Sequence, residues 1–303
     1  MPEPQDIEPD YEELLRRLRD GMIVPFFGAG ASVSCGLPSG GALTTKLVLA
    51  GKYPEPGPSV NLALAASYFV AREGGDTVAL NGLLRKSLVI NDAKPGPIHQ
   101  LLAQTVFNEL RLYVTTNYDN LVERALEQQN RSPWVIVDRG SAGKVWCRRP
   151  GKSMWEEVES KNLRYTIKES KNPIVLKLHG SVHEEEHRAE EYYLITEENY
   201  VDFLGRPEGG QLPQMLAAHM RPRSFLFLGY GLKDWNIRVM LRKLAETRAR
   251  NRVRSWAIVL RPTPADRTLW QAQDVTLHSI DLADLARKLS ETLAAQDEAG
   301  AST

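Results

Sequence analysis

The chain has 303 residues, of which 42% are hydrophobic and 25% are charged, as is usual for a soluble globular protein. Its 38 basic residues balance its 38 acidic residues, so the net charge does not support binding to nucleic acid or to an acidic membrane surface. Two cysteines exclude a four-cysteine zinc site and a disulfide framework, and no apolar run is long enough to span a bilayer. The acidic, proline-rich N-terminus is unlike a signal peptide, so we expect a cytoplasmic protein.

Two elements are predicted before residue 39. Residues 10–20 place their leucines on one face and predict a short amphipathic helix. Residues 22–27 are apolar and predict a strand that ends at Gly28-Ala29-Gly30-Ala31-Ser32. Glycines there let a phosphate approach the backbone, although a plain strand-to-helix turn would use them too. Val33 replaces the last glycine of the dinucleotide fingerprint and no acidic residue lies near position 50, which disfavours a nicotinamide dehydrogenase.

A helical insertion is predicted after this strand, at about residues 39–105. Proline- and glycine-rich loops divide it into helical segments near residues 40–51, 60–72, 77–89 and 96–105. The segment 60–71 is strongly apolar but too short for a membrane span, so we expect it to be a core helix.

The run Thr115-Thr116-Asn117-Tyr118-Asp119 lies where a strand ends and a helix begins. Residues 110–114 are apolar and partly β-branched, which predicts a buried strand, and residues 120–126 have apolar positions at helical spacing. In an open α/β sheet, ligands bind beyond the carboxyl ends of the strands. Asn117 and Asp119 are therefore candidate site residues, with capping of the following helix as the alternative.

Two later apolar runs also end in residues suited to a site. Residues 173–178 end at His179, which is placed for proton transfer in a cleft, with a hydrogen-bonded structural histidine as the alternative. Residues 224–228 end at Gly229-Tyr230-Gly231, and Asp234 is expected to cap the next helix.

The remaining pattern predicts further strands at residues 134–137, 256–260 and 275–277, and helices at 196–204, 210–220 and 281–295. Strands that alternate with helices predict an α/β fold with a doubly wound parallel sheet. Residues 138–172 are polar and aperiodic, which predicts an irregular insertion that could include a small hairpin, and residues 296–303 predict a disordered tail.

Two further patterns carry less weight. The run His183-Glu184-Glu185-Glu186-His187 fits a zinc-protease motif, but its charged neighbours leave no apolar helix face, so we expect a solvated loop and no metal. The arginine-rich stretch from Arg242 to Arg254 fits cations at a helix C-terminus, with an interface or a nucleic-acid patch as the alternative.

Taken together, five motifs resemble the sirtuin-like family in order and spacing, between about residues 20 and 290. They are Gly28-Ala29-Gly30-Ala31-Ser32, Gly36-Leu37-Pro38, Thr116-Asn117-Tyr118-Asp119, Leu178-His179-Gly180 and Gly229-Tyr230-Gly231. The chain is most similar to the bacterial sirtuin-like NAD hydrolases of anti-phage defence. The resemblance implies a Rossmann-like NAD-binding domain over residues 21–295, preceded by the helix within residues 1–20.

The resemblance also implies the site residues. Asn117 and His179 match the catalytic Asn and His of the family. The NAD-binding residues that it implies are Gly28, Ala29, Gly30, Ser32, Thr116, Asp119, Gly229, Tyr230, Gly231 and Asp234.

Two departures disfavour protein deacylation. The chain lacks the four cysteines of the deacylase zinc module, and Pro38 is followed by Ser39-Gly40-Gly41 where deacylases have Asp-Phe-Arg. We therefore expect an NAD hydrolase that cleaves the nicotinamide–ribose bond without a metal. An NAD-dependent deacylase or ADP-ribosyltransferase, and a catalytically silent nucleotide-binding assembly module, are the alternatives.

Such an enzyme needs two roles filled. The amide of Asn117 would position the ribose or the attacking water, and His179 would act as general base, with neither residue needed for folding. Because unchecked NAD cleavage harms the host and the family-like region leaves no room for a sensor domain, we expect a homo-oligomer, a separately encoded ATPase or sensor partner, or both.

Overall fold

The structure is a computed structural model, and it describes most of the chain. The described residues are 8–55, 57, 59–89, 93–109, 111–138, 144–159, 162–163, 171–182, 192–205, 220, 222–230 and 254–301. Several predicted features lie outside them: Gly231, Asp234 and the helix after it, His183 and His187, most of the helix at 210–220, and the arginine-rich stretch before Arg254.

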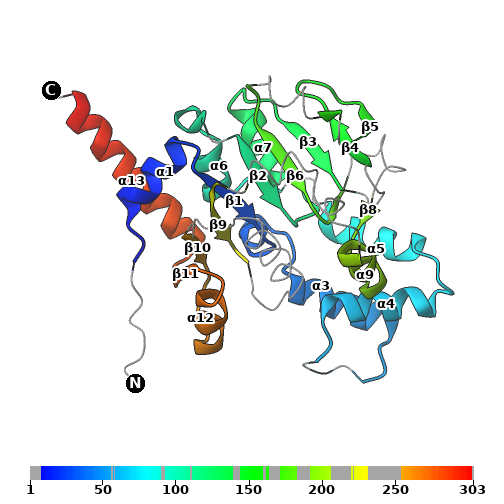
Figure 1. Cartoon of the computed structure of the whole chain (residues 1–303). Coiled ribbons are helices and arrows are strands. Elements are labelled where there is room, and N and C mark those ends of the chain that lie inside the picture. Colours follow the sequence, from blue (N-terminus) through cyan, green and yellow to red (C-terminus); the bar gives the residue numbers. More distant parts are fainter. Residues whose placement is uncertain are drawn as a thin grey trace.

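A single mixed sheet forms the centre of the described fold (Figure 1). Its strands are β1 (Ile23–Phe27), β2 (Leu112–Thr115), β3 (Trp134–Val137), β4 (Lys144–Arg148), β5 (Trp155–Glu159), β6 (Ile174–Lys177), β9 (Ser224–Leu228), β10 (Ser255–Ile258) and β11 (Val275–His278). They lie in the order β11-β10-β9-β1-β2-β6-β3-β4-β5. Neighbours from β11 to β3 are parallel, whereas β4 and β5 are antiparallel.

The direction of winding reverses at β1. From β1 the chain builds β2, β6 and β3 on one side, and later β9, β10 and β11 on the other. This order confirms the predicted doubly wound sheet and places its switch point between β1 and β9. Within the insertion predicted at 138–172, the structure contains the small hairpin that the sequence allowed. This hairpin, β4–β5, was not expected to extend the main sheet; it does so because Val145 and Cys147 alternate with more exposed neighbours and bury one face.

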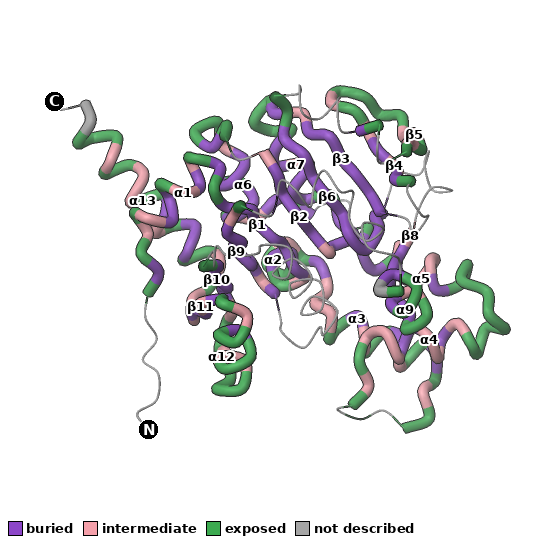
Figure 2. Tube along the Cα trace, in the orientation of Figure 1, coloured by how far each residue is buried: buried purple, intermediate pink, exposed green. Residues whose placement is uncertain are grey.

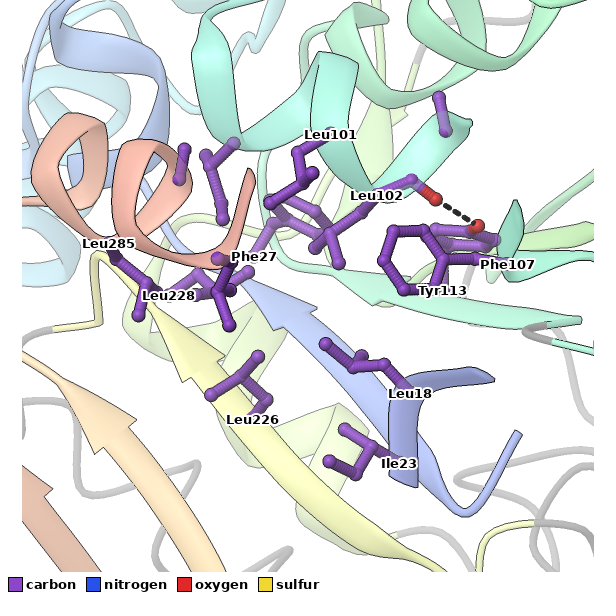
Figure 3. Packing of buried hydrophobic residues seen from close by; sticks show 14 of the residues in the cluster. Leu18, Ile23, Phe27, Leu101, Leu102, Phe107, Tyr113, Leu226, Leu228 and Leu285 are labelled. Atoms are coloured by element: carbon purple, nitrogen blue, oxygen red, sulfur yellow. Dashed lines mark hydrogen bonds between the residues drawn. The ribbon is translucent and has the colours of Figure 1, made fainter. Parts of the chain in front are cut away.

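Alternation along the strands separates two cores. On one face, residues such as Phe27, Tyr113 and Leu226 pack with apolar side chains of four helices. These helices are α1 (Tyr11–Arg19), α6 (Pro97–Ala103), α7 (Leu121–Gln128) and α13 (Leu282–Ala301). In Figure 3 the Tyr113 hydroxyl donates to the Leu102 carbonyl at 2.7 Å, which satisfies a polar atom inside this core. Figure 2 shows the central strands buried and the outer helix faces exposed.

The opposite face is covered in part by α12 (Pro264–Gln271), a helix that the sequence analysis did not predict. Its Trp270 is fully buried and packs on Phe227, with ring centroids 4.9 Å apart. The sequence does contain a helix-start signal here, because Thr263 and Asp266 form a capping box and Pro264 occupies the first helical position.

A helical cluster lies beyond one end of the sheet (Figure 1). It contains α3 (Gly40–Gly51), α4 (Leu62–Arg72) and α5 (Val78–Leu88), and α9 (Glu197–Gly205) and the short strands β7 (Gly180–Ser181) and β8 (Tyr192–Tyr193) lie beside it. α6 falls within the range 39–105 but packs on the sheet instead, because its leucines face the core shared with α7 and α13.

The C-terminal residues differ from the prediction of a tail disordered from 296. α13 continues to Ala301, and Arg19 of α1 donates to the side chain of Gln296 at 2.9 Å. This contact anchors the last turns of the helix to α1. Among the described residues, no helix combines the length and apolar character needed to cross a membrane.

The turn after β9 generates a stability prediction. Gly229 has φ +66°, and a Cβ there would lie 2.2 Å from Ala31 N in α2 (Gly30–Val33). Gly229→Ala should therefore lower the free energy of unfolding by roughly 1–3 kcal/mol, or by more if the turn cannot shift. Gly82→Ala, inside α5 with no atom within 4 Å of the added Cβ, is the matched control and should be neutral or stabilising. Equal thermal midpoints for the two variants would contradict this account of the turn.

Candidate functional site

The strand register brings the predicted site residues to one edge. Phe27 pairs with both Thr115 and Leu228, and Thr115 pairs with Lys177, so four parallel strands end in one row. The loops that follow begin at the same level. Asn117 and His179 each lie two residues beyond this row. The register therefore accounts for their convergence.

A cleft of about 1040 Å³ opens beyond this row. The predicted site residues that line it are Gly28, Ala29, Gly30, Ser32, Thr116, Asn117, Asp119, His179, Gly229 and Tyr230. Gly231 and Asp234 lie outside the described residues. The far wall comes from α3, α4 and the segment between them, and is largely apolar, with Leu43, Val48, Val60 and Leu62.

Asn117 is held from two sides. Its backbone N donates to the Thr115 hydroxyl at 2.9 Å. Its Nδ2 donates to the Gly28 carbonyl at 2.9 Å and to Ser32 Oγ at 3.0 Å. Both amide hydrogens therefore have partners, one in the turn after β1 and one in α2, and Oδ1 is the remaining polar atom of the side chain. Asn117 does not cap α7, so that alternative is wrong for this residue.

Asp119, which precedes the N-cap residue Asn120, bonds to the first turn of α7. Its Oδ1 accepts from Leu121 N at 3.1 Å, while its Oδ2 accepts from the Ser32 hydroxyl at 2.8 Å. Ser32 thus accepts from Asn117 and donates to Asp119, which connects two loops that are far apart in the sequence. Asn117, Asp119 and Ser32 are each at most 8% exposed, and buried polar groups in such a chain stabilise one arrangement when all are paired.

The glycines after β1 have a packing role. A Cβ on Gly28 would lie 2.5 Å from the Tyr230 ring, and one on Gly30 would lie 2.7 Å from the Gly229 carbonyl. Gly30 N donates to that same carbonyl at 2.9 Å. Close approach of the two switch-point turns is therefore sufficient to explain these glycines, whatever binds in the cleft.

His179 is 5% exposed and lies against aromatic side chains. Its ring meets Tyr200 edge-on, with centroids 5.5 Å apart, and Phe203 at 6.4 Å, both from α9. Its carbonyl accepts from Leu194 N at 2.8 Å. Tyr200 also lines the cleft, and the sequence analysis missed it because nothing in the pattern of residues 196–204 indicates which face turns toward the sheet.

The sequence analysis also did not identify two buried titratable side chains, Lys177 and His99. Lys177, the last residue of β6, forms an ion pair with Glu123 of α7 at 3.0 Å. A lysine at the end of the apolar run Ile174–Lys177 was the available signal, because central parallel strands are normally apolar throughout. His99 of α6 is stacked on Phe27, with centroids 5.1 Å apart.

Comparison with known proteins identifies the family. A family model described as a SIR2-like domain matches residues 111–278, more than half of the chain. The chain belongs to this family of SIR2-like domains. The matched region includes both Asn117 and His179 and begins after the glycine turn that follows β1.

This SIR2-like chain is similar to two curated proteins, each called NAD(+) hydrolase ThsA. It is 24% identical to the Bacillus cereus (strain MSX-D12) protein, covering 77% of this chain and 42% of that protein. It is 22% identical to the Acinetobacter baumannii (strain 532279) protein, covering 84% and 46%. The chain thus spans less than half the length of these relatives. It is also similar to a solved SIR2 homologue–NAD complex, with 19% identity, a TM-score of 0.47, and coverage of 93% of this chain and 94% of that one.

His99 yields a prediction about pH. Burial lowers the pKa of His99 from 6.5 to about 4, although the negative charge of Asp119 acts in the opposite direction. Neither ring nitrogen has a hydrogen-bond partner within the described part of the chain. As the pH falls from 6.5 toward 4, the unfolded chain binds a proton at His99 that the folded chain does not. Stability is therefore lost over this window, by roughly 3 kcal/mol in full.

The test is His99→Phe, which keeps a ring on Phe27 but cannot titrate. Between about pH 7 and pH 5 the variant should lose roughly 2 kcal/mol less stability than the parent, measured by urea denaturation at each pH. Parallel stability curves for variant and parent would show that His99 is not buried as a neutral group.

Proposed function

We propose that this SIR2-like domain cleaves the nicotinamide–ribose bond of NAD and transfers the ADP-ribose to water. The observation that carries the proposal is the convergence of Asn117 and His179 on one cleft at the switch point of a doubly wound sheet. Two further facts support it: curated relatives of this region are named NAD(+) hydrolases, and the cleft, at about 1040 Å³, has the size of a large small-molecule site.

The chemistry needs little from the protein beyond positioning and one base. Cleavage of a bond between a sugar carbon and a leaving group passes through an oxocarbenium-like state. Since both amide hydrogens of Asn117 are bonded within the protein, its Oδ1 is the atom that would accept a hydrogen bond from a ribose hydroxyl or the attacking water. His179 would take the proton from that hydroxyl or water as general base.

The NAD contacts would come from the loops at the switch point. The turn Gly28-Ala29-Gly30 and the turn at Gly229 line the cleft. Thr116 and Tyr230, which also line it, are held together by a hydrogen bond from the Tyr230 hydroxyl to the Thr116 hydroxyl at 3.1 Å. Asp119 would act through Ser32 and Asn117, because its carboxylate oxygens are bonded to Ser32 and to the start of α7.

The proposal extends to the setting of the reaction. No metal takes part, the protein works in the cytoplasm, and the activity serves NAD depletion in anti-phage defence. Homo-oligomerisation, a separately encoded ATPase or sensor partner, or both restrain it, because unchecked NAD cleavage harms the host. The assay below is therefore run with and without a chelator and over a dilution series. Loss of activity restored by zinc, or full activity of a dilute monomer, would contradict these parts.

Turnover of three variants tests the proposed site. His179→Ala should lose about 10²–10⁴ in turnover, as expected for a lost general base. Asn117→Ala should lose most turnover as well. The Asn117 amide donates hydrogen bonds to Gly28 and Ser32, so the Asn117→Ala variant should also lose about 1–3 kcal/mol in free energy of unfolding. This result would revise the expectation that Asn117 is not needed for folding. Asn120→Ala is the matched control on the same loop, since this exposed residue makes no side-chain cap bond.

The measurements are release of nicotinamide from NAD and the thermal midpoint of each purified variant. Asn120→Ala should match the parent in both. If either His179→Ala or Asn117→Ala, once shown to be folded, retains near-parent turnover, the site has been misassigned.

A further inference from the structure

A buried ion pair lies beneath the two strand ends that carry Asn117 and His179. The Nζ atom of Lys177 lies 3.0 Å from Oε1 of Glu123, in the first turn of α7. The side chains are 0% and 4% exposed. Removing two charges from water is costly, and apolar residues of similar volume often stabilise a fold equally well. Stability alone is therefore a weak explanation for charged residues at these positions.

Lys177 interrupts an apolar sheet face. Val175, two residues earlier on the same face, packs in the core cluster that includes Val122 of α7, whereas Leu176 belongs to the cluster on the opposite face. An apolar residue at position 177 would continue the face. Instead, the ammonium group donates a hydrogen bond to the backbone carbonyl of Asp119.

This contact joins the Asn117 loop to the segment that carries His179. Two other bonds between these segments connect backbone atoms alone: Leu178 N donates to Thr115 O and Val182 N donates to Tyr118 O, each at 2.9 Å. The bond from Lys177 to Asp119 is made by a side chain. Of these three hydrogen bonds, only the one from Lys177 would be lost if the side chain were substituted.

We propose that Lys177, held in place by Glu123, is a positioning residue that fixes the Asn117 loop relative to His179. The inference rests on the proposed function, because it assigns the pair a purpose only if these two residues act together. Neither Lys177 nor Glu123 lines the cleft itself; Lys177 acts on the site through the backbone carbonyl of Asp119, a residue that does line it.

The test removes both charges together. Lys177→Met alone would leave the Glu123 carboxylate buried, and its Oε2 already has no hydrogen-bond partner within the described residues. The double variant Lys177→Met/Glu123→Leu avoids an uncompensated charge. We expect it to fold with a KM for NAD near that of the parent and a kcat lower by about 10- to 100-fold, because a misplaced catalytic group impairs the reaction more than binding.

Hydrogen exchange supplies a readout that needs no turnover. Amides of residues 116–120 should exchange at least about tenfold faster in the double variant, because the loop has lost one of its anchors. Val175→Ala is the matched control: it removes buried apolar volume from the same strand and the same face but leaves the Asp119 contact intact. It should lose stability while keeping the parent kcat and the parent exchange in 116–120.

The outcomes separate this inference from the proposed function. A folded double variant that keeps either the parent kcat or the parent exchange rate in 116–120 overturns the positioning role. If the parent itself does not cleave NAD, the proposed function fails, and the exchange rates alone then support or overturn the link between Lys177 and the loop. Should the double variant not fold, Glu123→Gln, which retains an acceptor for Lys177, is expected to show smaller changes in the same two readouts, and parent values of either would overturn the role.

Discussion

The parallel register at the carboxyl edge of the sheet is the constraint on which the rest of the site depends. Phe27, Thr115, Lys177 and Leu228 end their strands in one row, so four loops start from the same level. Side chains that are far apart in the sequence are thereby brought to the same edge, as in other open α/β sheets. A shift of one residue in this pairing would turn Lys177 to the opposite face and move His179 along the edge.

Buried polar groups convert this coarse alignment into a defined geometry. Ser32 accepts a hydrogen bond from Asn117 and donates one to Asp119, and Asn117 also donates to the Gly28 carbonyl; leaving one of these buried groups unpaired would cost about 1–3 kcal/mol. The glycines at the switch point allow the turns after β1 and β9 to touch. The same residues therefore shape the cleft and maintain the fold, which is why substitutions there need a stability measurement beside every activity measurement.

Much of the sheet and the site could be predicted from the sequence, because buried parallel strands are continuous apolar runs. Residues 134–137 and 224–228 were predicted with the observed bounds, and polar or glycine residues at strand ends indicated the cleft. Lys177 was not recognised, since pairing with Glu123 depends on how α7 packs on the sheet. The contribution of Asn117 to the loop packing was not predicted, because its hydrogen bonds to Gly28 and Ser32 are long-range contacts that no local pattern encodes.

The most direct test of the central claim is product analysis after incubation of the purified protein with NAD in oxygen-18 water. The account predicts free nicotinamide and an equal amount of ADP-ribose that carries one oxygen-18 atom, with no ADP-ribose on protein. ADP-ribose attached to protein would indicate transfer to a protein acceptor. Binding of NAD without any cleavage, with the protein folded and any partner supplied, would contradict the claim that this cleft is a hydrolytic site.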